Sequence, residues 1–92
     1  MSNIPVGFFG TLALRNREMT LAETVQEAVG EYEKLFSRSA DICYVLQKDL
    51  DLAIDDDREN GQLAEVCSRV QVMPIKAGLP GHHVMAGRRD QA

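Results

Sequence analysis

The chain has 92 residues, 45% of them hydrophobic and 26% charged, with a formal net charge of −4 at pH 7. This size and composition fit one globular domain, 1–92, and argue against a chain that is disordered throughout. No apolar run approaches the ~18 residues that span a bilayer, and an acidic chain lacks the basic face that a general nucleic-acid binder needs.

Charge is distributed unevenly along the sequence. Residues 18–65 carry a net charge of −9, whereas residues 1–17 carry +2 and residues 66–92 carry +3. An acidic body with basic ends favours contact with a basic protein surface, or head-to-tail self-association. A role in solubility alone explains the same distribution, so the sequence leaves these interpretations open.

Two features of the sequence predict a cytoplasmic protein. The first basic residue is Arg15, so the N-terminus lacks the basic region of a secretory signal. Cys43 and Cys67 are too few for a disulfide scaffold, and we expect two reduced thiols.

Residues 1–17 are expected to form an edge strand or an arm that packs on a neighbouring subunit. The apolar run 6–14 contains two glycines, which weaken a strand interior. Phe8 and Phe9 are adjacent, and two such side chains should not stay in water. We therefore predict that Phe8 and Phe9 belong to an interaction surface.

The main helix is predicted over residues 20–37. Its first residues, "TLAE", form a capping box in which Thr20 and Glu23 each bond the backbone of the other. Gly30 weakens a helix interior and is expected to mark close approach to another backbone. Apolar residues recur at the spacing of one helical face, at Leu21, Val25, Ala28, Val29, Tyr32, Leu35 and Phe36.

The middle of the chain predicts a buried strand followed by short helical pieces. Residues 42–46 are apolar on both faces of a strand, which is typical of a central strand. Residues 48–55 have enough apolar side chains for one or two helical turns. Residues 56–62 are predicted to form a polar loop, and residues 63–67 another helical turn. The acidic loop does not match an EF-hand, because Arg58 would stand at a ligand position.

The C-terminal residues 69–88 are predicted to form a β-hairpin. Two apolar runs are separated by "AGLPG", in which Pro80 and Gly81 suit a type II turn. Pro74 indicates an edge position or a bulge. The predicted fold class is therefore α+β: a small antiparallel sheet of three or four strands, with one main amphipathic helix on one face and a C-terminal β-hairpin.

His82 and His83 begin the second strand of this hairpin. Successive side chains of a strand point to opposite faces, so the two imidazoles are not expected to share a metal ion. We expect one of them at the sheet or subunit interface and the other in solvent. The sequence also has no HExxH, CxxC or glycine-rich phosphate loop, so we expect no cofactor.

The function predicted from these features is association rather than catalysis. Open strand edges on a small domain favour a homodimer, which then contacts a larger protein partner. The interaction residues predicted are Phe8, Phe9, His82 and His83. The alternative is a small-ligand or metal-binding domain with its site at the C-terminal hairpin, where His82 or His83 would act with Tyr44 or Cys43.

Overall fold

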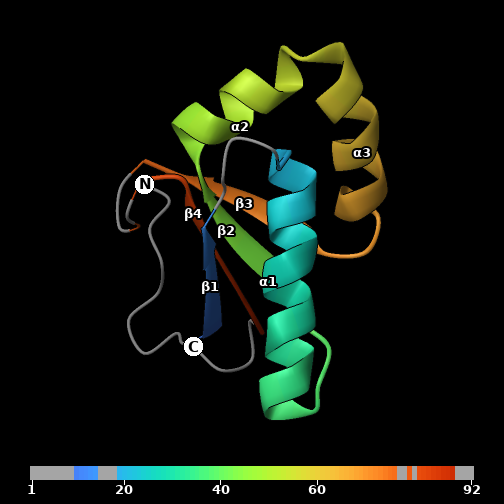
Figure 1. The fold of residues 1–92 in the computed structure, drawn as a ribbon, viewed down its shortest axis with the longest axis vertical. Helices are drawn as coiled ribbons and strands as arrows, with labels where there is room; N and C mark the ends of the chain where they lie inside the picture. Colours follow the sequence, from blue (N-terminus) through green and yellow to red (C-terminus); the bar gives the residue numbers. More distant parts are fainter. Residues whose placement is uncertain (1–9, 15–18, 77–78, 80, 89–92) are drawn as a thin grey trace.

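Four strands and three helices form two layers in the computed structural model (Figure 1). It describes residues 10–14, 19–76, 79 and 81–88, with the backbone alone for 57–60. In chain order the elements are β1 (Gly10–Leu14), α1 (Leu21–Phe36), β2 (Ile42–Leu46), α2 (Gln47–Ile54), α3 (Asp57–Cys67), β3 (Gln71–Ile75) and β4 (His83–Gly87). The strands lie in the order β1-β4-β2-β3, so β2 and β4 are central and β1 and β3 are the edges.

All three helices pack on the same face of the sheet. The main core joins Val25 and Tyr32 of α1 to Cys43 and Val45 of β2 and to Val66 of α3. The opposite face carries a smaller cluster, to which no described helix contributes. Its members are Ile42, Tyr44 and Ile75, with Met73 and Leu79 packed against them.

The α+β class with four strands is confirmed, but the sheet is mixed rather than antiparallel throughout. β4 pairs antiparallel with both β1 and β2, whereas β2 and β3 are parallel. A parallel pair needs a crossover of a dozen or more residues. Residues 47–70, which contain α2 and α3, supply that crossover.

The prediction of a β-hairpin over residues 69–88 is wrong. β3 and β4 do not pair, because β2 lies between them in the sheet. Two neighbouring apolar runs joined by a Pro-Gly turn have the same sequence pattern whether the two strands pair directly or lie on either side of a third strand. Pro74 does lie on an edge strand as predicted, where its missing N–H group is tolerated.

The main helix is confirmed, with Thr20 as its N-cap and Ser37 as its C-cap. The Glu23 amide donates to the Thr20 hydroxyl at 3.1 Å and the Thr20 amide donates to the Glu23 carboxylate at 3.0 Å, which completes the capping box. Thr11 ties β1 to this helix, since its buried hydroxyl donates to the Ala28 carbonyl at 2.6 Å.

Two local predictions need correction. Residues 57–62 belong to α3 rather than to a polar loop, so the helical segment predicted at 63–67 is longer. Gly30 approaches no other backbone within the described structure, because a Cβ added there would have no described atom within 4 Å. Gly10 is the glycine that allows close approach, since a Cβ added there would overlap the Ala86 carbonyl oxygen.

We predict opposite effects for the same substitution at these two glycines. Gly10→Ala should lower the free energy of unfolding by about 2 kcal/mol, because β1 must move away from β4. Gly30→Ala should raise it by about 0.5–1 kcal/mol, because alanine is the better residue in an open helix position. Urea denaturation of both variants measures this. A Gly10→Ala variant as stable as the wild type would show that β1 does not pair with β4 as described.

Candidate functional site

The predicted interaction residues lie in different places. Phe8 and Phe9 are outside the described residues. His83 begins β4 opposite Leu14 and faces away from the helices, since its neighbour Val84 belongs to the main core. His82 precedes the strand with a φ of 61°, in the left-handed region.

The two imidazoles have separate partners. Nδ1 of His83 lies 2.9 Å from the Gly81 carbonyl oxygen, and because a carbonyl only accepts, Nδ1 donates there. Nδ1 of His82 instead lies 3.5 Å from Oδ1 of Asp49. Within the described part of the chain, no group of three or more His, Cys, Asp or Glu residues is placed to hold a metal ion.

The residues named for a ligand site at the C-terminal hairpin also separate. Tyr44 lies on the same face of the sheet as His83, because Tyr44 pairs with Met85, two residues further along β4. Cys43 lies on the opposite face, within the main core. Burial raises the pKa of the Cys43 thiol to about 12, although a hydrogen bond from the Met85 backbone lowers it in part.

Asp49 is a buried carboxylate that the sequence analysis did not single out. Its side chain is only 4% exposed, in the first turn of α2. Oδ2 has no hydrogen-bond partner among the described residues, and Oδ1 lies 3.5 Å from Nδ1 of the exposed His82 imidazole. Asp49 lies four residues before Ala53, which is the spacing of one helical face. Because Ala53 is buried, this spacing places the Asp49 carboxylate on the apolar side of α2, and it was the signal in the sequence that could have identified Asp49 as buried.

The β1 edge presents exposed leucines without any charge. Leu12 and Leu14 are 49% and 56% exposed, on the face of the sheet away from the helices. Leu12 pairs with Met85, and Met85 pairs with Tyr44, so apolar side chains continue inward from the edge. The sequence of β1, GTLAL, contains no charged residue and no proline.

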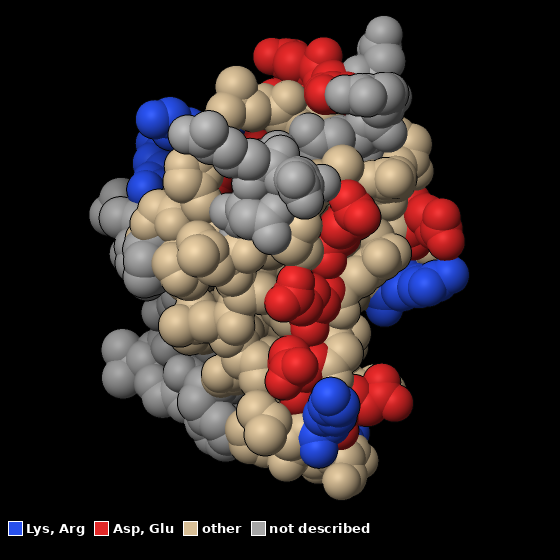
Figure 2. All heavy atoms as spheres, in the orientation of Figure 1, with Lys and Arg blue, Asp and Glu red and all other residues tan. Residues whose placement is uncertain are grey.

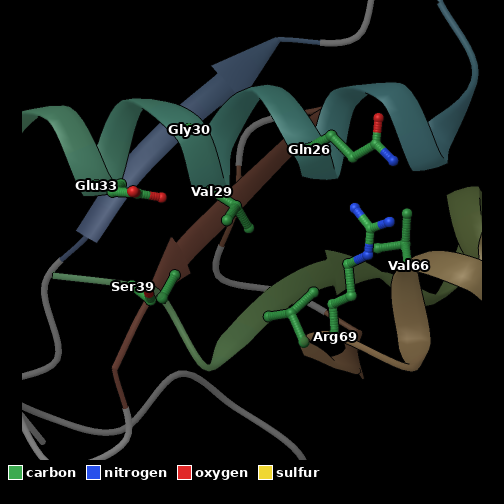
Figure 3. Close-up of a pocket in the computed structure, with 9 residues that line it drawn as sticks. Gln26, Val29, Gly30, Glu33, Ser39, Val66 and Arg69 are labelled. Carbon is green, nitrogen blue, oxygen red and sulfur yellow. The ribbon is translucent and has the colours of Figure 1, made fainter.

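A groove of about 490 Å³ lies between α1 and the end of α3 (Figure 3). In Figure 3, Arg69 extends toward α1 near Gln26, and Glu33 and Ser39 lie at the opposite end. Val29 points into the groove from α1 (Figure 3). The apolar lining residues are Val29, Ala40, Val66 and Val70, and Gly30 completes the α1 side.

Comparison with known proteins gives no match to this chain: no family model, no curated protein and no solved structure matches it. Among the described residues, no helix is long and apolar enough to cross a lipid bilayer. Two surface features of the described residues bear on function, the β1 edge and the groove beside α1.

The two thiols should differ in reactivity. Cys43 is buried with a raised pKa, whereas Cys67 is exposed. At pH 8 a thiol with a pKa of about 12 is ionised in about one molecule in ten thousand, and the thiolate is the reactive form. Titration with Ellman's reagent should therefore find one fast thiol in the native protein and two after unfolding. A Cys67→Ser variant should show no fast thiol, and a fast reaction in that variant would contradict the burial of Cys43.

Replacing the buried carboxylate should stabilise the fold. Asp49→Asn removes the acidic group from a buried position where Oδ2 lacks a described partner, and should raise the free energy of unfolding by about 1 kcal/mol. Asp51→Asn, on the exposed side of the same helix, should change it by less than about 0.5 kcal/mol. Thermal and urea denaturation measure both. A clear loss of stability in Asp49→Asn alone would show that the charge is needed by the fold.

Proposed function

We propose that this protein is a non-enzymatic interaction protein that forms a homodimer through the outer edge of β1, with which no other described strand pairs. The observation that carries this proposal is an uncharged edge strand bearing two half-exposed leucines. Monomeric proteins usually protect a sheet edge with charge, proline or a covering element, because an open edge pairs with other strands. The other edge, β3, contains Pro74, so the two edges of this sheet differ.

Strand β1 suits pairing with a second copy of itself. In an antiparallel pair related by a two-fold axis at Leu12, each Leu12 lies opposite its own counterpart, and Leu14 lies opposite the counterpart of Gly10. Gly10 has no side chain, so it leaves room beside it for the opposing leucine. The two sheets would then form one sheet of eight strands.

Two further parts of the proposal concern location and site residues. We propose a cytoplasmic location, which the two free cysteines support because reducing compartments keep thiols unpaired. His83 would lie at the margin of the dimer interface, because it pairs with Leu14 across the sheet. His82 would not belong to it, since its ring lies beside Asp49.

Sedimentation velocity at micromolar concentration tests the dimer. The wild type should sediment as a species with twice the 10.2 kDa mass of a single chain. Leu14→Lys should weaken self-association by roughly tenfold or more, because it places charge in an apolar contact. Leu52→Lys is the matched control, since Leu52 is 57% exposed but lies on α2. A wild type that sediments only as a monomer, or equal effects of the two variants, would refute the proposal.

Cross-linking tests the arrangement of the strands. In a background with Cys67→Ser, a Leu12→Cys variant should form an intermolecular disulfide on mild oxidation, because the two-fold axis brings the two thiols together. Leu52→Cys in the same background should not. Cross-linking of both variants to the same extent would show random collision instead of strand pairing.

A further inference from the structure

We propose that the groove beside α1 binds a basic amphipathic helix of another protein, with the closest approach at Gly30. This surface belongs to the helix layer and shares no residue with β1. The proposal adds the chemistry of a partner to the interaction function proposed above, and it does not require the dimer.

Gly30 is the first observation that supports it. The residue lies in the interior of α1 and is exposed. Glycine in a helix interior costs roughly 1 kcal/mol relative to alanine. No described neighbour requires the glycine, because a Cβ there would meet no described atom within 4 Å. The helix therefore bears a destabilising residue whose open surface is available to another molecule.

The shape of the surface around Gly30 is the second observation. The groove lies on one side of this glycine, and a more open hollow lies on the other, with Glu27, Glu31 and Lys34 around it. Gly30 and Glu33 line both, so the depression continues across α1 where a side chain is missing. A helix crossing here could approach closely, because the distance between packed helices, about 8–10 Å, depends on the side chains at the contact.

Charge identifies the kind of occupant. Figure 2 shows acidic side chains gathered in a row over α1, in the same orientation as Figure 1. The exposed acidic residues of this helix are Glu23, Glu27, Glu31 and Glu33. The cation that lines the groove, Arg69, is already paired with Glu65 at 3.0 Å. Of these residues, Glu33 lines the groove, whereas Glu27 and Glu31 line the neighbouring hollow. Lysine or arginine on the occupant would be attracted to these glutamates, while its apolar side chains contact the valines that line the groove.

A second copy of the chain is the less favourable occupant. Its longest helix, α1, is itself acidic on the exposed side, so two such helices would place glutamates against glutamates. A basic helix meets no such repulsion. Charge complementarity therefore favours a different protein as the source of the helix.

Fluorescence anisotropy with a designed peptide tests the proposal. The probe is a fluorescein-labelled peptide of about 15 residues, with leucine and lysine at helical spacing. The same sequence with every lysine replaced by glutamate is the control probe. The lysine peptide should bind saturably, and its affinity should fall when the salt concentration rises from about 0.05 to 0.3 M. The glutamate peptide should not bind.

Variants of the protein locate the binding. Gly30→Leu fills the depression with a residue that favours the helix, and should weaken binding of the lysine peptide by about tenfold or more. Gly61→Leu is the matched control on α3, because a Cβ there also has no described atom within 4 Å, and it should leave the affinity unchanged. The triple variant Glu27→Gln, Glu31→Gln, Glu33→Gln should bind more weakly and with less dependence on salt. Circular dichroism verifies that each variant is folded.

The outcomes separate this proposal from that of the homodimer. Binding is measured in both the wild type and the Leu14→Lys variant, so loss of self-association does not affect the result. Absence of binding by the lysine peptide would overturn the proposal. Equal binding by the glutamate peptide, or equal affinities of Gly30→Leu and Gly61→Leu, would also overturn it, because the peptide would then adhere without using the groove.

Discussion

The double burial of β2 is the constraint on which the rest of the structure depends. Cys43 and Val45 face the helices, and Ile42 and Tyr44 face the opposite side, all of them buried. A strand that is apolar on both faces needs apolar side chains packed around it on each side and a hydrogen-bonded neighbour on each edge. Strands β3 and β4 occupy those two edges. Among the described strands, the edges of the sheet therefore fall on β3 and β1.

These two edges are not equivalent. Pro74 removes a donor from β3, whereas β1 retains every backbone amide and bears no charge. Strand β1 is also held firmly in position. Gly10 lets its backbone lie close to Ala86, and the Thr11 hydroxyl donates to the Ala28 carbonyl of α1. An edge strand fixed in this way presents its leucines in a defined geometry, and less entropy is then lost on association.

The sequence predicted the elements whose signals are local. The capping box and the apolar period placed α1 within one residue of its observed ends, and the two-sided apolar pattern identified β2 as central. The separation of β3 from β4 could not be predicted in this way, because it depends on β2 lying between them. The groove beside α1 was equally hidden, since it joins Val29 to Val66 and Val70 from distant parts of the sequence. Gly30 was noticed, but the sequence could not show that no described residue packs over it.

The division of charge between the two layers makes the two proposed interactions compatible. The edge strand β1 is uncharged, so two copies meet there without repulsion between side chains of like charge. The exposed side of α1 is acidic, and glutamates such as Glu27 and Glu31 would disfavour contact between two such helices while attracting a basic one. Because the residues of the groove and those of β1 do not overlap, a dimer would present two separate grooves, each beside the acidic side of α1. A partner with two basic helices at suitable spacing would then bind more tightly than one with a single helix, through effective concentration alone.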